Sequence, residues 1–232
     1  MLIGGLQKLT LVDYPGKVVA TVFLIGCNFR CPFCQNPELV DPDEIKKQPE
    51  ISEKEFSNFL DQRKGLIDGV CITGGEPTIH KDLIDFIKKI KQKGFLIKLD
   101  TNGSNPEVLE KLIKSKLLDF ISMDIKTSWS KYDLATGVKV DLEKIKKSAE
   151  IIKNSGIDYE FRTTIVPGLV GKEDVERMGE WLKGAKNFAL QQFQNKKVLD
   201  KSFEKIQPYP EGTLKEFKKI LEKYIERIEL RI

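Results

Sequence analysis

The sequence alternates about six times between short apolar segments and amphipathic segments with helical spacing. The apolar segments, which predict strands, are 17–26, 69–73, 95–99, 120–123, 159–166 and 188–193. The segments that predict helices begin at 52, 83, 105, 141, 174 and 213, the first and last of them at Ser/Thr-x-x-Glu capping boxes. Residues 228–232 alternate and predict a short edge strand. Such alternation is typical of a parallel sheet with crossover helices, so we expect an α/β fold, either an open sheet or a partial (β/α) barrel.

Length and composition narrow the class of protein. The chain has 232 residues, is 40% apolar and shows no Gly/Ser-rich linker, so we expect a single domain over 1–232. The net charge of +4 is spread along amphipathic segments, which does not indicate nucleic-acid binding. Neither a signal peptide nor a membrane-length apolar run is visible, and we expect a cytoplasmic protein without membrane contact. A single histidine, His80, nearly excludes His-based zinc hydrolases and Ser-His-Asp triads.

Unusual polar sequences follow four of the expected strands. They are the cysteine loop after the first, Gly74–Pro77 after the second, Asp100–Gly103 after the third and Asp124–Lys126 after the fourth. Ligands of α/β folds bind where the carboxyl ends of the strands converge. We therefore expect these four segments to line one pocket.

The cysteine loop has the spacing C-x3-C-x2-C, formed by Cys27, Cys31 and Cys34. In a reducing compartment, such clustered thiols favour a metal or redox site over disulfides. Structural zinc is one interpretation, but no second ligand pair follows; Cys71 is either a distant fourth ligand or, as we prefer, a small buried apolar side chain. An iron–sulfur cluster held by three thiolates keeps one iron open for another ligand.

The loop, with Phe33 just before its third cysteine, resembles the signature of the radical S-adenosylmethionine (radical SAM) enzymes. The glycine-rich segment after the second strand strengthens this resemblance, which covers most of the chain. It implies a partial (β/α)6 barrel with parallel strands and outer helices. It also implies a 4Fe-4S cluster on Cys27, Cys31 and Cys34, with S-adenosylmethionine (SAM) chelating the open iron.

The resemblance also assigns roles to the second strand end. Gly74 and Gly75 would let the backbone approach the methionine amino group of SAM, and Glu76, followed by Pro77, would help hold this segment. The alternative is a plain turn between a strand and a helix.

The later strand ends allow two interpretations each. Asp100, Thr101 and Asn102 form either an Asx turn or a set of hydrogen-bond partners for the SAM ribose hydroxyls. Asp124 and Lys126 form either a surface ion pair or, by resemblance, contacts to the ribose and the methionine carboxylate. We expect Arg162, a charged residue on the fifth strand, to face the barrel mouth.

Three longer segments resemble the activating enzymes of glycyl radical proteins, most of all those of anaerobic ribonucleoside-triphosphate reductase. They are 5–16, 27–37 and 162–168. The resemblance implies abstraction of a glycine Cα hydrogen from that reductase, with ferredoxin or flavodoxin as electron donor. Alternatives are an activator of pyruvate formate-lyase, a small-molecule radical SAM enzyme similar to 7-carboxy-7-deazaguanine synthase, and a zinc-bearing structural module.

Overall fold

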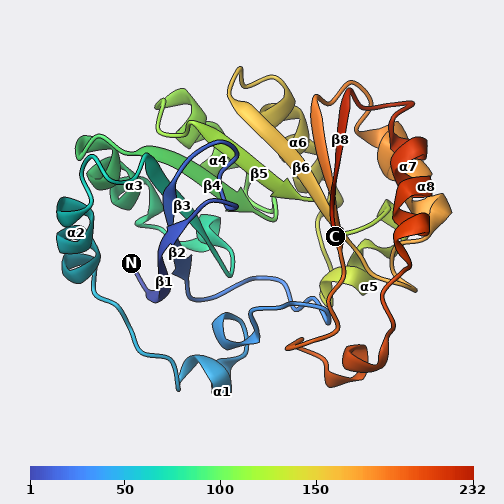
Figure 1. The fold of residues 1–232 in the computed structure, drawn as a ribbon, viewed down its shortest axis with the longest axis horizontal. Helices are drawn as coiled ribbons and strands as arrows, with labels where there is room; N and C mark the ends of the chain where they lie inside the picture. Colours follow the sequence, from blue (N-terminus) through green and yellow to red (C-terminus); the bar gives the residue numbers. More distant parts are fainter.

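One curved sheet contains all eight strands, and the larger helices cover its outer side (Figure 1). The computed structural model describes residues 1–232. The strands, which neighbour one another in sequence order, are β1 (Ile3–Thr10), β2 (Val19–Leu24), β3 (Gly69–Gly74), β4 (Leu96–Thr101), β5 (Phe120–Asp124), β6 (Asp158–Ile165), β7 (Asn187–Gln192) and β8 (Arg227–Arg231). Strands β2 to β8 are parallel, and β1 pairs antiparallel with β2. Because β1 and β8 do not pair, the sheet is a partial barrel, which confirms the expected fold class.

The main helices follow the strands as the alternation predicts. They are α2 (Glu53–Gln62), α3 (Leu83–Gln92), α4 (Pro106–Lys114), α6 (Leu142–Lys153), α7 (Lys172–Trp181) and α8 (Glu211–Leu221), with the shorter α1 (Pro42–Ile45) and α5 (Tyr132–Thr136) in loops. None of the helices is both long and apolar enough to cross a membrane. The short 3-10 turns are η1 (Pro37–Leu39), η2 (Pro77–Ile79), η3 (Trp129–Lys131) and η4 (Lys201–Lys205).

Two local expectations have different outcomes. Ser52 is the N-cap of α2, as expected, and its Oγ accepts a hydrogen bond from the Glu55 N–H at 3.1 Å. The capping box expected at Thr213 is wrong, because α8 begins at Glu211 with Pro210 as N-cap. Thr213 therefore lies inside the first turn, and its N–H donates to the Pro210 carbonyl at 3.0 Å.

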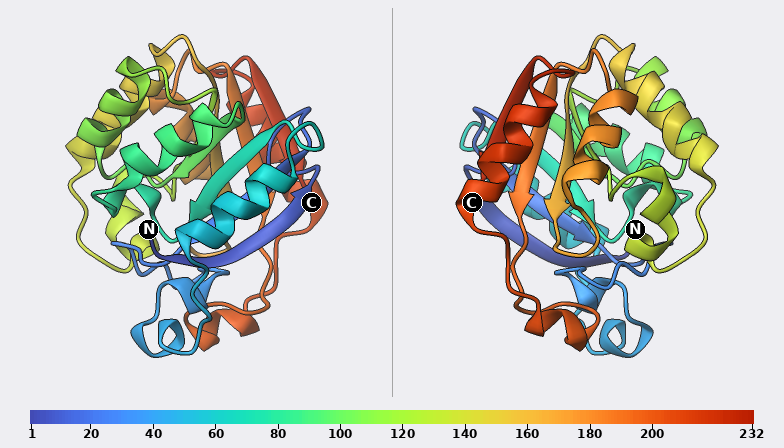
Figure 2. Two further views of the ribbon diagram at one scale, coloured as in Figure 1. Left: turned by 90° about the vertical axis from the view of Figure 1, so that its left-hand side faces the viewer. Right: turned by 90° about the vertical axis from the view of Figure 1, so that its right-hand side faces the viewer.

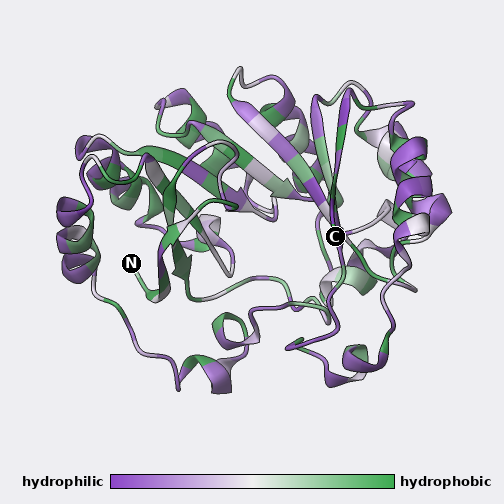
Figure 3. Ribbon diagram, in the orientation of Figure 1, coloured by the Kyte–Doolittle hydropathy of each residue, from purple (hydrophilic) through white to green (hydrophobic).

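Side chains alternate in polarity across the wall of the barrel. Successive strand residues point to opposite faces, and on β4 the apolar Ile97 and Leu99 alternate with Lys98 and Asp100. The apolar face packs against the helices, whose surfaces turned away from the sheet are mostly hydrophilic (Figure 3). The polar face lines the barrel interior, which places charged groups beneath the mouth.

Two excursions project together beyond the carboxyl ends of the strands (Figure 2). One contains η1 and α1; the other, residues 194–206 after β7, is called here the strap. The Leu199 N–H of the strap donates to the Cys34 carbonyl at 3.0 Å, and the Asp200 N–H to the Pro32 carbonyl at 2.9 Å. The strap therefore joins the late part of the chain to the cysteine loop across the open side of the sheet.

Candidate active site

The strand ends converge on one pocket at the barrel mouth, of about 1000 Å³ including its open side. All the candidate residues from the sequence line it except Pro77: Cys27, Cys31, Phe33, Cys34, Gly74, Gly75, Glu76, Asp100, Thr101, Asn102, Asp124, Lys126 and Arg162. Pro77 is buried at the start of η2. Thr164 and Gln191 also line the pocket; Thr164 lies in the segment 162–168 but was not singled out there, and Gln191 belongs to no recognisable motif.

The three cysteines lie on a short loop after β2, with Cys31 buried and the other two half-buried. The loop is a tight turn, in which the Cys34 N–H donates to the Cys31 carbonyl at 3.0 Å and the Phe29 N–H approaches the Cys27 Sγ at 3.3 Å. Burial raises the pKa of Cys27 to about 11 and that of Cys31 to about 12, and nearby Lys126 opposes both shifts. Buried thiols of this kind ionise when a bound cation compensates the charge.

This donor set fits a four-iron cluster. No three His, Cys, Asp or Glu side chains are arranged to hold one metal ion. A cluster does not need such convergence, because each thiolate binds a different iron atom. Three thiols in one pocket would therefore hold three irons and leave the fourth without a protein ligand.

The cysteine loop is also hydrogen-bonded to the loop after β4. Asn28 Nδ2 donates to Ser104 Oγ at 2.9 Å, and Asn102 Nδ2 donates to Asn28 Oδ1 at 2.9 Å. The Ser104 N–H in turn donates to Asn102 Oδ1 at 2.9 Å. Asn28 and Ser104 were missed as candidate residues because nothing in the sequence indicates that these loops meet.

The two glycines at the end of β3 allow the main chain there to pack directly against the main chain at the end of β2. A Cβ on Gly75 would lie 1.9 Å from the Gly26 carbonyl oxygen. Gly74 has a φ of +117°, and a Cβ there would lie 2.3 Å from the Leu24 nitrogen. Any side chain would thus separate the ends of β2 and β3, which the Gly75 N–H joins by donating to the Leu24 carbonyl at 2.9 Å.

Glu76 is 1% exposed and organises the strand ends around it. Its Oε1 accepts hydrogen bonds from the Thr78 N–H at 3.0 Å, the Thr78 hydroxyl at 2.5 Å and the Thr101 hydroxyl at 2.8 Å. Its Oε2 accepts from the Asn102 N–H at 2.6 Å. Burial raises the pKa of Glu76, and these hydrogen bonds oppose the shift. Thr101 and Asn102 are therefore engaged with their neighbours, Glu76 and Asn28, at the pocket wall.

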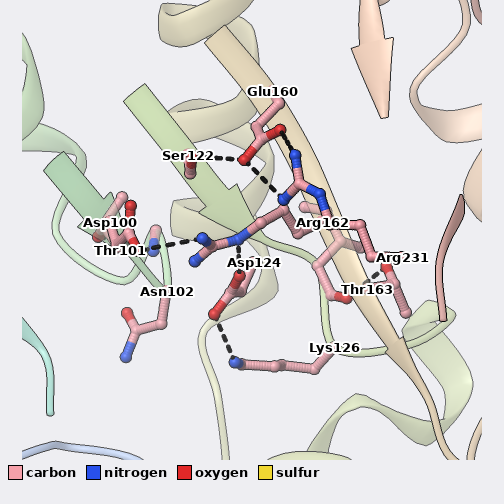
Figure 4. Close-up of polar contacts among 12 residues, drawn as sticks. Asp100, Thr101, Asn102, Ser122, Asp124, Lys126, Glu160, Arg162, Thr163 and Arg231 are labelled. Atoms are coloured by element: carbon pink, nitrogen blue, oxygen red, sulfur yellow. Dashed lines mark hydrogen bonds and ion pairs between the residues drawn. The ribbon is translucent and has the colours of Figure 1, made fainter. Parts of the chain in front are cut away.

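Charged side chains of alternating sign cross the floor of the pocket (Figure 4). Arg162 Nη1 donates to Asp100 Oδ2 at 3.0 Å, and its Nε donates to Asp124 Oδ1 at 2.8 Å. Lys126 Nζ donates to Asp124 Oδ2 at 3.1 Å. Burial opposes ionisation of Asp124, but Arg162 and Lys126 outweigh it and hold the pKa of this carboxyl well below its usual range. Burial also opposes ionisation of Asp100, but Arg162 and Lys98 outweigh it and lower the pKa of this carboxyl, so both aspartates are ionised at neutral pH.

Cys71 and His80 lie outside this pocket. Cys71 is fully buried on β3, as preferred from the sequence, and burial raises its pKa beyond the range in which thiols ionise. His80 is half-buried at the end of η2, and burial lowers its pKa. Neither side chain contributes to the group of three cysteines.

Comparisons with known proteins agree with this arrangement. The family model described as the Radical SAM superfamily matches residues 21–182. A Methanocaldococcus jannaschii protein assigned by name as a glycyl-radical enzyme activating enzyme is 37% identical and covers 99% of this chain and 95% of its own. The pyruvate formate-lyase-activating enzyme of Streptococcus mutans is 29% identical over 80% of this chain and 73% of its own.

Solved structures share the fold. Streptococcus suis SuiB bound to its precursor peptide SuiA matches 90% of this chain with a TM-score of 0.67 at 17% identity. Coproporphyrinogen III oxidase from Escherichia coli matches 91% with a TM-score of 0.62 at 13% identity. The chain spans about half the length of each. From its motifs, its fold and these matches, the chain belongs to the radical SAM superfamily, whose enzymes use a 4Fe-4S cluster and SAM, and within it to the family of glycyl-radical enzyme activating enzymes.

Proposed function

We propose that Cys27, Cys31 and Cys34 hold the 4Fe-4S cluster and that SAM completes the coordination of the remaining iron. The observation that carries this proposal is the meeting of three thiols and a row of paired charges in one open pocket. Phe33, buried at the pocket wall, excludes water from the cluster side. The zinc-bearing module has no comparable support in the family match.

The polar residues of the pocket are suited to hold SAM. A carboxylate has about four lone-pair sites, and Asp100 and Asp124 each use two of them within the charged row. The remaining sites accept hydrogen bonds from the ribose hydroxyls. Lys126 Nζ has one carboxylate partner and further N–H groups free for the methionine carboxylate.

The glycines and Glu76 give the methionine end of SAM a fixed wall. Gly74 and Gly75 line the pocket with main-chain atoms only, so the methionine amino group can approach the backbone closely. Glu76, with Pro77 following it in η2, fixes that backbone from behind. Thr101 and Asn102 support the SAM site indirectly, through their hydrogen bonds to Glu76 and to Asn28 of the cysteine loop.

The cluster held by Cys27, Cys31 and Cys34, together with SAM, would supply one-electron chemistry that abstracts a hydrogen atom from the substrate. We propose that the abstracted hydrogen atom comes from a glycine Cα near the C-terminus of anaerobic ribonucleoside-triphosphate reductase. The products are a glycyl radical on the reductase and 5′-deoxyadenosine. Ferredoxin or flavodoxin supplies the electron. Residues 1–232 act as one radical SAM domain in the cytoplasm.

Pyruvate formate-lyase is a second candidate for the protein substrate. The 29% identity with the Streptococcus mutans activating enzyme over 80% of this chain favours it. The chemistry at the pocket is the same for both partners, so the choice depends on recognition outside the cluster site.

The test is an anaerobic incubation of the reconstituted protein with SAM, a reductant and each glycyl radical protein in turn. We expect 5′-deoxyadenosine by chromatography and a glycyl signal by electron paramagnetic resonance with the ribonucleotide reductase. A signal with pyruvate formate-lyase alone would select the second candidate. Failure to form either the brown iron–sulfur chromophore or 5′-deoxyadenosine would overturn the enzyme assignment itself.

A further inference from the structure

Lys98 is a buried lysine inside the barrel, two residues before Asp100 on β4. Its side chain is 2% exposed, and its Nζ donates to Asp100 Oδ1. Its Nζ also lies 3.8 Å from the Cys71 Sγ and 5.9 Å from the centroid of the Phe120 ring. Asp100 is its one ion-pair partner. Lys98 was not among the residues expected from the sequence, because the recognisable motif, Asp100–Gly103, begins only after it.

The position of Lys98 completes the row of charges on the pocket floor. Arg162 donates a hydrogen bond to Asp100 Oδ2 and Lys98 donates one to Asp100 Oδ1, so both carboxylate oxygens have a cationic partner. The row then runs from Lys98 through Asp100, Arg162 and Asp124 to Lys126, alternating in sign throughout. Lys126 lines the pocket at one end, whereas Lys98 at the other end does not. Any effect of Lys98 on a ligand must therefore pass through Asp100.

The energetics favour a role beyond stability. A buried ion pair seldom stabilises a fold more than well-packed apolar residues of similar size, because both charges lose their hydration. A buried pair does fix the orientation of its members. With Arg162 alone, the Asp100 carboxylate would keep one anchor and could turn about its Cβ–Cγ bond.

We propose that Lys98 is a positioning residue, which holds the Asp100 carboxylate in the orientation that receives the ribose hydroxyls of SAM. This inference rests on the proposed binding of SAM in the pocket. Lys98 does not touch the ligand, and it acts by fixing one oxygen of Asp100 while Arg162 fixes the other.

The substitution Lys98→Met tests this role, because it keeps the length of the side chain and removes its charge. The readout is the dissociation constant of SAM, measured by anaerobic calorimetry on cluster-loaded protein. We expect binding to weaken about tenfold, the usual scale for a lost hydrogen bond to a charged group. Lys98→Gln, which keeps an N–H donor, is expected to recover part of the affinity.

A pH series separates positioning from general destabilisation. The charged or titratable groups that face Asp100 are Lys98 on β4, Arg162 on β6, Asp124 on β5 and Cys71 on β3. Burial and the negative charge of Asp124 raise the pKa of Asp100, whereas Arg162 and Lys98 lower it. In Lys98→Met only Arg162 still lowers it, so the pKa of Asp100 should be higher than in the wild type. As the pH falls, SAM binding by Lys98→Met should therefore begin to weaken at a higher pH than binding by the wild type.

Two comparisons make the outcome decisive. In a double-mutant cycle, Lys98→Met should add no loss to that of Asp100→Asn, because Lys98 acts only through Asp100. The matched control is Lys91→Met, since Lys91 pairs with Asp119 outside the pocket at 2.8 Å and should leave SAM affinity unchanged.

Wild-type affinity in Lys98→Met, or additive losses in the cycle, would overturn the inference while leaving the proposed function intact. If the wild type itself does not bind SAM, the proposed function fails, and this inference fails with it. Melting temperature and iron content show whether each variant is folded and loaded. If Lys98→Met does not fold, Lys98→Gln decides by the same two readouts.

Discussion

At the scale of single residues, this site depends on side chains that hold other groups in place. Glu76 is fully buried among four hydrogen-bond donors and joins the end of β3 to the loop after β4. Gly75 lets the ends of β2 and β3 approach each other, where even a methyl group would meet the Gly26 carbonyl. The pocket wall is therefore fixed by residues whose own contacts are within the protein.

The cysteines give the first prediction. Alanine at Cys27, Cys31 or Cys34 removes one of three cluster ligands, and we expect each variant to lose bound iron and all SAM cleavage. Iron analysis and 5′-deoxyadenosine chromatography measure the two losses. Cys71→Ala is the matched control, because Cys71 lies outside the pocket. An equally inactive Cys71→Ala protein that is still folded would show that the ligand set is wrong.

The second prediction concerns Gly75. Gly75→Ala places a methyl group 1.9 Å from the Gly26 oxygen, so the strand ends must separate. We expect a loss of about 2–3 kcal/mol in the free energy of unfolding, the scale of overpacking in a rigid site, measured by denaturant titration. Gly184→Ala serves as a control for added bulk, since its Cβ would meet no atom within 4 Å, although its φ of +80° carries some strain. Equal losses in the two variants would refute the role of close approach.

At the scale of elements, loops from distant parts of the chain hold the cysteine loop. The strap donates two main-chain hydrogen bonds to it, and Leu199, like Cys34, packs against the small apolar cluster of Ile25, Leu39 and Val40. On the far side of the site, Asp174 of α7 accepts hydrogen bonds from Ser128 Oγ at 2.5 Å and Lys131 Nζ at 2.7 Å. These contacts join the segments that follow β5 and β7 to the rest of the mouth.

The strap supplies the third prediction. Leu199→Ala removes apolar contacts beside the cysteine loop, so the loop should open more often and release its cluster. We expect faster iron loss to a chelator, by about tenfold for a loss of some 1.4 kcal/mol of packing. Lys197→Ala is the control, because it removes only an exposed ion pair with Glu38. Identical release rates for Leu199→Ala and the wild type would mean that the strap does not restrain the loop.

Asp174 gives a fourth prediction, which depends on pH. Burial opposes its ionisation, but Lys131, Ser128 and the Gly171 N–H outweigh it and lower the pKa of Asp174. A lowered pKa in the folded protein stabilises it above the unfolded value of about 4, and this stabilisation is lost as the pH falls through the folded value. Asp174→Asn should therefore be less stable than the wild type at neutral pH, by about 1–2 kcal/mol.

The same variant should show a shallower acid transition. Denaturant midpoints measured from neutral pH downward should differ most at neutral pH and converge as the pH falls through the lowered pKa of Asp174. A constant difference at every pH would show that the ionisation of Asp174 does not contribute.

At the scale of the whole molecule, charge inside the barrel links strands that are not neighbours. Arg231 on β8 forms a two-pronged pair with Glu160 on β6, at 3.2 and 2.6 Å, across the intervening strand β7. Glu160 also accepts from Ser122 Oγ at 2.8 Å (Figure 4). The open edge strand β8 is thus held to the barrel by side chains as well as by its hydrogen bonds to β7.

This pair gives the fifth prediction. Arg231→Met leaves the Glu160 carboxylate buried with only Ser122 as partner, and we expect the free energy of unfolding to fall by about 2 kcal/mol. Arg227→Met is the matched control, because Arg227 lies exposed on the same strand without an ion pair. Denaturant titration compares them, and equal stabilities would show that the pair across β7 contributes nothing.

The sequence by itself determined the parallel α/β architecture, the grouping of polar motifs at one edge and the three cysteines. Each depends on local information: hydrophobic period, cap residues and spacing. Strand β1 (Ile3–Thr10) escaped prediction because its two glycines and exposed side chains form no apolar run, and only pairing with β2 makes it a strand.

Tertiary structure alone decided which motifs contact each other. Thr101 and Asn102 hydrogen-bond Glu76, Asn28 meets Ser104, and Lys98 pairs with Asp100 beneath the pocket. Apart from Lys98 and Asp100, which lie two residues apart on β4, these contacts join different strands or loops, and their geometry depends on strand register and barrel curvature. Neither quantity can be read from a single segment. The residues that carry the chemistry can be recognised in the sequence, whereas the residues that position them are identified only in the folded molecule.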